Sequence, residues 1–372
     1  MLRRQYGTTG KHLSVLGFGC MRYPRDRFGN IDEDLTLRML KRAAELGINI
    51  FDTAAIYDGG RSEEILGRAL REIKAEVYVS TKNHYKGRDR GEWRRVLEGS
   101  LRRLDIEQIH FYHFHDLRWE QFREAISAPG GPLEEARRAK EEGIIGHLCF
   151  SSHDSPENVI RLIETGEFEG LLVQYNLLDR KYGTAIERAV KKGMGVLVMG
   201  PVGGGRLATL PGREAEALRK AGMSPAELAL RFVLSNPFVT SALSGMNSFE
   251  MLEENVKVAS RGDPLSDTER RLIKEVAEGM RGLSELYCTS CGYCLPCPYG
   301  VDIPGNFTAM LLLKLYGLPG EARAKYRSLL EERASADLCV ECGECLEKCP
   351  QKIPIPERLK EVERALGEGK VY

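Results

Sequence analysis

Eight of the ten cysteines fall within the last 85 residues, and their spacing is that of metal ligands. They form two groups, and each group ends in a cysteine followed by proline: Cys288, Cys291, Cys294 and Cys297, then Cys339, Cys342, Cys345 and Cys349. A disulfide framework would require an oxidising compartment, and the N-terminal residues lack the pattern of a secretory signal. Cysteines separated by two residues suit both tetrahedral zinc and iron–sulphur clusters.

Two features favour iron–sulphur clusters over zinc. First, three cysteines at successive steps of three allow one loop to hold three corners of a cubic cluster, and a proline follows the fourth cysteine of each group. The second group has the bacterial ferredoxin spacing C-x2-C-x2-C-x3-C-P, in which the fourth cysteine binds the other cluster. The sequence therefore predicts two [4Fe–4S] clusters, with zinc or one degraded site as the alternative. The crossing rule assigns Cys288, Cys291, Cys294 and Cys349 to one cluster and Cys297, Cys339, Cys342 and Cys345 to the other.

The first group departs from this spacing, because two residues rather than three separate Cys294 from Cys297. Between the groups lie 41 residues with helical patterns at Phe307–Leu315 and Glu321–Glu332. This helical insert resembles the α-helical ferredoxins of succinate dehydrogenase iron–sulphur subunits. Residues 284–372 carry 13 acidic and 11 basic residues, which fits an acidic electron-transfer face or an ordinary solvated surface.

A second set of reactive side chains lies in the first 283 residues, where short apolar runs end in polar residues. Asp52 ends the second run, Lys82 ends the third and His115 ends the fourth, and Tyr57 follows Asp52 by five residues. Each alone has a structural interpretation, as a cap, a solvated cation or a core side chain. Together they suit proton donation to a carbonyl.

The chemistry rests on the acidity of the phenol. Lowering a phenol pKa from about 10 to about 7 corresponds to about 4 kcal/mol. An ammonium about 4 Å away supplies energy of that order at an effective dielectric constant of about 20. We therefore expect Lys82 to acidify Tyr57, Asp52 to keep Lys82 charged, and His115 to orient the substrate carbonyl.

The elements that would position these residues alternate between strands and helices. Ser224-Pro225-x-Glu227 has the signature of a helix start, and Asp32 and Ser155 are N-cap candidates. Eight strand–helix pairs in about 260 residues predict a (β/α)8 TIM barrel, in the α/β class, followed by a small α-helical ferredoxin-like domain. A doubly wound open sheet is the alternative, but it would more often carry a Gly-x-Gly-x-x-Gly turn. The expected strands are Leu13–Phe18, Ile48–Asp52, Val77–Thr81, Ile109–His115, Ile144–Ser151, Leu171–Tyr175, Val196–Met199 and Val239–Ser244. The expected helices are Leu35–Leu46, Glu63–Ile73, Glu92–Leu104, Leu133–Glu142, Pro156–Thr165, Ala185–Lys192, Pro225–Leu234, Phe249–Ala259 and Thr268–Met280.

Composition narrows the functional classes. The chain has 372 residues, enough for two domains, which we place at 1–283 and 284–372. Lys and Arg total 54 and so do Asp and Glu, so no global basic field indicates a nucleic acid partner. No apolar run is long enough to span a membrane. We expect a soluble cytoplasmic protein.

Residues 1 to about 283 resemble the aldo-keto reductase family. The resemblance rests on residues 51–57 (Phe-Asp-Thr-Ala-Ala-Ile-Tyr), 62–67 (Ser-Glu-Glu-Ile-Leu-Gly), 80–82 (Ser-Thr-Lys), 112–115 (Tyr-His-Phe-His) and 174–177 (Gln-Tyr-Asn-Leu). It implies a catalytic tetrad of Asp52, Tyr57, Lys82 and His115. With the cysteine-rich tail, the whole chain resembles an aldo-keto reductase fused to a ferredoxin domain.

The resemblance also implies a binding site for NADP(H) or NAD(H). Ser151, Ser152 and Gln174 match positions that hold the nicotinamide carboxamide, and the family commonly has Asn in place of Ser152. Glu254 and Asn255 match positions that contact adenine. The loops after the seventh and eighth strands, which include Pro201, Gly203, Gly245 and Asn247, fall where barrels often bind phosphate.

Three positions depart from the family pattern. Met199 replaces the aromatic residue that usually stacks under nicotinamide. Gly245 and Met251 replace basic residues that usually clasp the 2′-phosphate, so the choice between NADPH and NADH stays open, with Arg206 and Lys257 as candidate substitutes. The usual C-terminal substrate loop is replaced by the cluster domain.

The main functional hypothesis is NAD(P)H-dependent reduction of a small carbonyl substrate, or the reverse alcohol oxidation. The clusters would exchange electrons with a one-electron partner protein, or serve as structural or sensory groups. Hydride carries two electrons and each cluster passes one, so a flavin is a possible mediator, although no flavin motif supports it.

Two alternatives have different chemistry. One is a non-catalytic electron-transfer or redox-sensing subunit that retains the barrel. The other is a metal-dependent hydrolase barrel with His113, His115 and His153 as ligands. The second alternative explains neither Tyr57 with Lys82 nor the cysteine-rich tail. The sequence does not indicate an oligomeric state.

Overall fold

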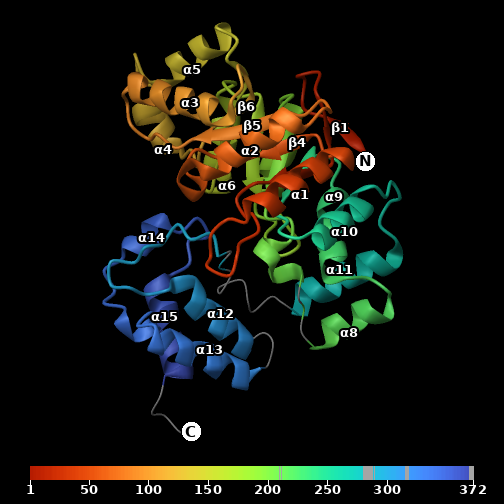
Figure 1. Cartoon of the computed structure of the whole chain (residues 1–372), viewed down its shortest axis with the longest axis vertical. Coiled ribbons are helices and arrows are strands. Elements are labelled where there is room, and N and C mark those ends of the chain that lie inside the picture. The colour runs from red at the N-terminus through yellow and green to blue at the C-terminus, as the bar shows by residue number, and fades with distance from the viewer. Residues whose placement is uncertain (209, 211, 280–287, 289, 315–317, 368–372) are drawn as a thin grey trace. The chain divides into compact units, whose positions relative to one another are not determined.

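The computed structural model describes residues 1–208, 210, 212–279, 288, 290–314 and 318–367 (Figure 1). The chain divides into two compact units, which are Met1–Val202 with Ala226–Ser266, and Gly203–Pro225 with Asp267–Tyr372. The predicted boundary between residues 283 and 284 lies outside the described residues and stays a prediction.

The first unit contains a closed barrel of eight parallel strands, which confirms the predicted fold class. Each strand pairs with its neighbours in chain order, and the last strand pairs with the first to close the barrel. Parallel pairing places all eight carboxyl ends at one mouth, where barrel enzymes carry their active sites. The strands are β3 (Leu16–Gly19), β4 (Ile50–Asp52), β5 (Tyr78–Asn83), β6 (Ile109–Phe114), β7 (Ile145–Ser151), β8 (Gly170–Gln174), β9 (Gly195–Met199) and β10 (Ser241–Ser244).

Helices follow the strands and pack on the outside of the barrel (Figure 1). Two of them begin at the predicted N-caps, since Asp32 accepts a hydrogen bond from the backbone N–H of Leu35, and Ser155 accepts one from that of Asn158. These caps satisfy amide groups that the first helical turn leaves without a partner. The elements are α1 (Glu33–Glu45), η1 (Tyr57–Gly60), α2 (Arg61–Glu72), α3 (Arg90–Leu104), α4 (Trp119–Gln121), η2 (Phe122–Ile126), α5 (Pro132–Glu141), α6 (Pro156–Glu164), α7 (Gly183–Lys191), α9 (Pro225–Leu234) and α10 (Phe249–Ala259).

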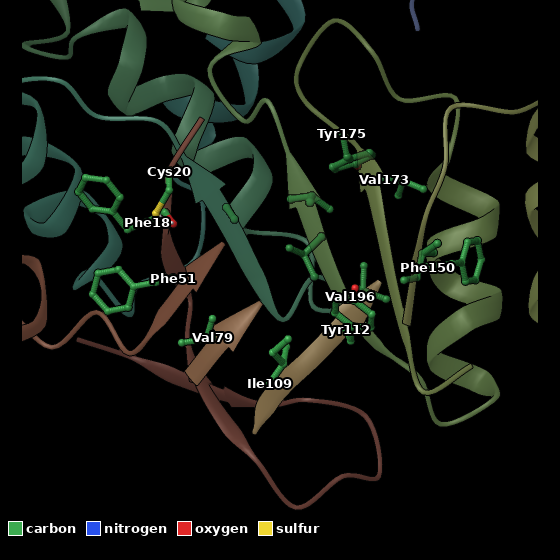
Figure 2. Close-up of a cluster of buried hydrophobic side chains, with 14 of the residues drawn as sticks. Phe18, Cys20, Phe51, Val79, Ile109, Tyr112, Phe150, Val173, Tyr175 and Val196 are labelled. Carbon is green, nitrogen blue, oxygen red and sulfur yellow. Dashed lines mark hydrogen bonds between the residues drawn. The ribbon is translucent and has the colours of Figure 1, made fainter. Parts of the chain in front are cut away.

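Side chains on the strands alternate between the barrel interior and the helices. Ile50, Tyr78 and Phe111 belong to one buried cluster with residues of four further strands of the barrel, inside the barrel. Phe51 and Val79, each one residue further along, belong to the larger cluster that includes residues of the surrounding helices (Figure 2). Because side chains on a strand alternate, a step of two residues keeps the same orientation.

The start of the barrel differs from the prediction of one strand over Leu13–Phe18. The structure has an antiparallel pair, β1 (Arg3–Gln5) and β2 (His12–Ser14), before β3 begins at Leu16. Gly7 and Gly10, between these two strands, both have positive φ. β2 ends at Ser14, whose backbone N–H donates to Asn49 Oδ1 and whose hydroxyl donates to the carbonyl of Leu16. The apolar residues on both sides of Ser14 made the two strands look like one in the sequence.

The second unit is helical. The predicted helices Phe307–Leu315 and Glu321–Glu332 correspond to α12 (Ile303–Lys314) and α13 (Pro319–Glu331). α12 packs against both α13 and α15 (Ile355–Leu366), which agrees with apolar side chains around most of its surface (Figure 1). α15 was not predicted from the sequence. The unit also contains η3 (Gly203–Ala208), α8 (Gly212–Lys220), α11 (Asp267–Gly279), η5 (Ala336–Leu338) and α14 (Glu344–Lys348). Among the described helices, none is long and apolar enough to cross a membrane.

Candidate active site and cysteine sites

Polar side chains take the inward positions nearest the barrel mouth. Steps of two residues from the interior residues of β4, β5 and β6 lead to Asp52, Lys82 and His115. The same count on β7 and β8 leads to Ser151 and Gln174. Because β4, β5 and β6 are neighbours in the barrel, the first three side chains converge.

Lys82 and Asp52 form a buried ion pair. Lys82 Nζ lies 2.6 Å from Asp52 Oδ2, and it also donates to the carbonyl of Thr53 at 2.6 Å. The other carboxylate oxygen of Asp52 accepts a hydrogen bond from Ser80 Oγ at 2.6 Å. Lys82 is only 2% exposed, so the ammonium depends on these oxygens in place of water. The contacts with Asp52 and Thr53 therefore fix the Lys82 ammonium group at one point inside the barrel mouth.

Tyr57 stands next to this charge. Lys82 Nζ lies 4.9 Å from the centroid of the Tyr57 ring. The ring of His115 meets it edge-on, with centroids 6.1 Å apart. Tyr57 begins η1, and the next three residues, Asp58, Gly59 and Gly60, all have positive φ. This turn returns the chain to α2 and leaves the Tyr57 ring beside Lys82 and His115.

His115 is buried as a neutral imidazole. Burial lowers the pKa of His115 well below its ordinary value, and the positive charges of Lys82 and Lys86 lower it further. A neutral ring can donate one hydrogen bond to a carbonyl oxygen without adding a positive charge. Lys86 donates to the backbone carbonyl of His115 and, at 2.6 Å, to that of Asp116.

The sequence did not single out Ser80 and Lys86 individually. Ser80 joins Asp52 to a second interior histidine, because its hydroxyl also lies 3.1 Å from His113 Nε2. Burial lowers the pKa of His113 to about 3. The contacts of the Ser80 hydroxyl with Asp52 and His113 could not be predicted from the sequence. Its inward orientation could be, because Ser80 lies two residues before Lys82 on the same strand.

The residues proposed to hold nicotinamide have separate surroundings. Ser151 Oγ accepts a hydrogen bond from the backbone N–H of Asp116 at 2.9 Å. Ser152 points to the other side of β7 and donates to the carbonyl of Leu117 at 2.6 Å. Gln174 Nε2 lies 3.3 Å from Asp179 Oδ2, and Gln174 is buried. Ser151 and Gln174 thus face the barrel interior, whereas Ser152 supports the backbone of a loop.

The loops after β9 and β10 carry the remaining predicted nucleotide contacts. Met199 ends β9 and packs against the interior cluster, Pro201 is buried in the first unit, and Gly203 opens η3 in the second unit. Gly200 and Gly203 both have positive φ. Backbone turns of this kind expose N–H groups that can bind anions.

After β10, Asn255 Nδ2 lies 3.3 Å from Ser244 Oγ and joins α10 to the strand end. Glu254 and Asn247 are exposed. Gly245 lies against the side chain of Arg22, since a Cβ atom placed on the glycine would be 3.3 Å from the Cβ of Arg22. The resemblance implies a basic residue at position 245, and in this chain the nearby basic side chain is that of Arg22.

The eight cysteines of the tail line two adjacent hollows in the second unit. We call these hollows site A and site B. Cys294 and Ile303 border both of them. Site A is lined by Cys288, Cys291, Cys294 and Cys349, and site B is lined by Cys297, Cys339, Cys342 and Cys345. These are the two sets that the crossing rule predicts.

The donors in each hollow suit a cubic cluster. Each thiolate of a [4Fe–4S] cluster binds a different iron atom, so the four sulphur atoms surround a cube. The four cysteines of each site surround a hollow with apolar walls, such as Ile303 and Phe307 at site A.

The two cysteine loops repeat the same backbone conformation. The residue two positions after the first cysteine has positive φ in both loops, 52° at Ser290 and 59° at Glu341. The glycine that follows the second cysteine does too, with 77° at Gly292 and 80° at Gly343. Each glycine carbonyl accepts a hydrogen bond from the backbone N–H three residues on, at 2.9 Å. The loops therefore present their first three cysteines in the same way.

The repeat continues past the fourth cysteine. The backbone N–H of Gly300 donates to the carbonyl of Cys297, and that of Lys352 donates to the carbonyl of Cys349. α12 and α15 each begin six residues after these cysteines. The extra residue of the second group falls between its third and fourth cysteines, where the chain forms α14. The shorter spacing of the first group thus leaves Cys297 in the position that Cys349 has before its own helix.

Comparison with known proteins identifies the barrel. Residues 15–278 match the profile of the aldo/keto reductase family, and residues 287–353 match the profile of a 4Fe-4S dicluster domain. The chain belongs to the aldo/keto reductase family, which confirms the resemblance seen in the sequence.

Relatives and solved structures agree with this assignment. The oxidoreductase YqkF of Bacillus subtilis is 26% identical over 314 residues, covering 76% of this chain and 96% of the relative. L-galactose dehydrogenase of Arabidopsis thaliana is 26% identical over 307 residues with the same coverage. The holo form of aldo-keto reductase AKR11C1 from Bacillus halodurans matches with a TM-score of 0.64 at 27% identity, over 74% of this chain and 96% of that chain. The protein is an oxidoreductase, and about a quarter of it lies outside these matches.

Proposed function

We propose that the protein reduces a small carbonyl substrate with NADPH or NADH, or oxidises the corresponding alcohol, with Tyr57 as the proton donor. The observation that carries this proposal is the buried Lys82–Asp52 pair directly beside the Tyr57 ring. The nicotinamide supplies or accepts hydride when it is bound. The residues of this chain orient the carbonyl and hold the proton that neutralises the developing alkoxide.

Each member of the tetrad has one task. Lys82 places a positive charge next to the phenol and so favours release of its proton. Asp52 keeps Lys82 charged in a site with little water. His115, neutral in its buried position, donates a hydrogen bond that polarises the carbonyl.

We propose that Ser151 and Gln174 hold the nicotinamide carboxamide above Met199, and that Ser152, whose hydroxyl donates to the carbonyl of Leu117, contributes by fixing the adjoining loop. Glu254 and Asn255 would contact adenine, and the loops around Pro201, Gly203, Gly245 and Asn247 would bind the phosphates. Gly245 and Met251 carry no charge, so this set does not choose NADPH over NADH.

We also propose that sites A and B each hold a [4Fe–4S] cluster and exchange electrons with a one-electron partner protein. The support is that the two cysteine sets surround separate hollows and that their loops share one backbone conformation. A flavin on a partner would reconcile two-electron hydride chemistry with one-electron clusters. Thiolate ligands require a reducing compartment, and we propose the cytoplasm, with 1–283 and 284–372 as the two domains.

The first test compares the full chain with its Tyr57→Phe variant, both purified without oxygen. Reduction of 4-nitrobenzaldehyde by NADPH and NADH is expected to fall at least 100-fold in the variant, while iron and sulphide contents stay unchanged. Equal rates in the two proteins would contradict the role of Tyr57. No activity in either protein, over a series of aldehydes and ketones, would support a non-catalytic subunit that retains the barrel.

The second test concerns electron exchange. The oxidised protein is mixed with NADPH or NADH in a stopped-flow instrument, with and without added flavin, and the absorbance of the clusters is followed. Bleaching would show that the nucleotide and the clusters are coupled. Its absence under both conditions would favour a structural or sensory use of the clusters.

A further inference from the structure

Exposed apolar side chains border site B. Tyr299 is 48% exposed, Val340 is 57% exposed and Leu346 is 40% exposed. Tyr299 and Val340 line the hollow together with its cysteines, and Leu346 follows Cys345 directly. We call these three residues the apolar rim. On soluble proteins, contiguous exposed apolar patches with polar residues around them often mark sites where a partner binds.

The cysteines of site A are more buried than those of site B. Cys288 and Cys349 are buried, whereas Cys342 of site B is exposed. The apolar walls of site A come from side chains that are themselves buried: Ile303, Phe307, Ile353 and Ile355. The two sites share a backbone repeat but differ in the exposure of their cysteines, which favours site B as the site that an electron leaves.

The charges near the apolar rim are mostly negative. Glu341, Glu344 and Glu347 are exposed and lie between Val340 and Lys348 in the chain. Two of them have exposed lysine partners, since Lys348 Nζ lies 3.5 Å from Glu344 and Lys360 Nζ lies 2.7 Å from Glu341. Exposed pairs of this kind are weak and screened by salt. Four thiolates also outweigh the charge of an oxidised [4Fe–4S] core, so a loaded site B adds negative charge.

We propose that the apolar rim and its carboxylates form the docking surface for a one-electron redox protein with a basic face, and that site B exchanges the electron. This inference rests on the proposed electron exchange of the clusters. Transient redox complexes bury little surface and combine an apolar centre with a charged periphery. One electron leaves the reduced cluster and one acceptor centre on the partner gains it, with no bond or proton transfer.

Cytochrome c, a basic one-electron acceptor, serves as the probe. The full chain with its clusters is reduced with dithionite, excess reductant is removed, and haem reduction is followed in a stopped-flow instrument at low ionic strength. The double substitution Glu344→Lys and Glu347→Lys is expected to slow the second-order reaction about ten-fold and to weaken its salt dependence. Val340→Ser with Leu346→Ser is expected to slow it about three-fold or more.

Binding is measured separately with zinc-porphyrin cytochrome c, whose fluorescence reports the complex without reduction of haem iron. The Kd is expected to rise by the same factors as the rates fall. The matched control is Glu321→Lys with Glu331→Lys on α13, none of whose residues lines either site. Iron and sulphide contents show whether each variant retains its clusters. Unchanged rates and Kd in both rim variants, or an equal loss in the α13 control, would overturn the docking surface.

A small neutral acceptor, benzoquinone, separates this inference from the proposed function. If the rim variants reduce benzoquinone as fast as the wild type but reduce cytochrome c slowly, the docking surface is supported. If the reduced wild type passes electrons to neither acceptor, the electron exchange itself is wrong and the docking surface falls with it. If it reduces both and the rim substitutions change neither rate, only the docking surface is wrong.

Discussion

We expect the Lys82–Asp52 pair to contribute both to catalysis and to stability, and variants can separate the two contributions. Removing Lys82 alone leaves Asp52 as a buried carboxylate without its charge partner. We expect Lys82→Met to lower the free energy of unfolding by about 3 kcal/mol, because breaking a buried pair from one side is costly. It should also abolish carbonyl reduction.

The double variant Lys82→Met with Asp52→Leu removes both charges and should recover most of that stability without recovering activity. Urea unfolding can be followed by tryptophan fluorescence, since both tryptophans, Trp93 and Trp119, lie in the first unit. Activity in the double variant would show that the charge on Lys82 is not needed for the reaction.

Buried histidines make the barrel sensitive to acid. Burial lowers the pKa of His113 to about 3, below the value of about 6.5 in an unfolded chain. Between these values the unfolded chain binds the proton and the folded chain does not, so stability falls as the pH drops below about 6.5. At pH 5 this group should cost about 2 kcal/mol relative to pH 7.5.

His113→Gln removes this titration. The unfolding free energy of the variant, measured from pH 7.5 to pH 5 by tryptophan fluorescence, should fall less steeply than that of the wild type. Identical slopes would show that His113 does not remain neutral in the folded barrel.

At the scale of elements, the two cysteine loops make the ligand sets testable. Cys297 belongs to site B and Cys349 to site A, although each follows the three cysteines of the other site. We expect Cys297→Ser to impair the cluster of site B and Cys349→Ser to impair that of site A. Iron content should fall to about half in each case, and spectroscopy of the reduced proteins should show a different remaining cluster.

The docking surface supplies a further check. A Cys349→Ser protein that keeps the cluster of site B should still reduce cytochrome c, whereas Cys297→Ser should not. The same remaining cluster in both variants would contradict the crossed assignment.

Elements with a strong apolar periodicity could be predicted from the sequence, whereas elements that form because of contacts with other parts of the fold could not. The strand ends that carry Asp52, Lys82 and His115 follow from runs of apolar residues, and α9 begins at the predicted Pro225. β1 is a short strand of polar residues, and its pairing with β2 depends on Gly7 and Gly10. α15 lacks a side-chain N-cap bond, and its start signals, Pro356 and Glu357 in the first turn, lie in a short Pro-rich stretch that was not interpreted as a helix start.

The side chains that meet at the barrel mouth and the cysteines that line the two hollows were predictable because residue type and spacing indicate them; the catalytic role of the tetrad stays a prediction. Ser80 and Lys86 were not singled out, since one acts through hydroxyl contacts with Asp52 and His113 and the other through backbone carbonyls. The repeat between the cysteine loops was hidden by the one-residue difference around α14. The backbone angles, the hydrogen bonds of the loops and the starts of α12 and α15 show that the loops match.

At the scale of the whole molecule, the proposed function joins two-electron chemistry in the barrel to one-electron chemistry at the cysteine sites. The relatives and the solved structure reported above align over 96% of their own length with about three quarters of this chain. In the proposed reaction, hydride comes from the nucleotide and the proton from the tetrad of the first unit, so no step of the proposal uses a cluster.

We therefore expect carbonyl reduction to survive the loss of the clusters. Treating the full chain with a chelator and an oxidant removes the iron, and the second unit should lose structure because its cysteines lose the metal that joins them. The kcat for 4-nitrobenzaldehyde reduction should stay within about two-fold of that of the loaded protein, since proton donation by Tyr57 depends on Lys82 and His115 in the first unit. Reduction of cytochrome c should disappear in the same sample. If both activities fell together, with tryptophan fluorescence showing a folded barrel, the clusters would have to lie on the path of the electrons that reduce the carbonyl.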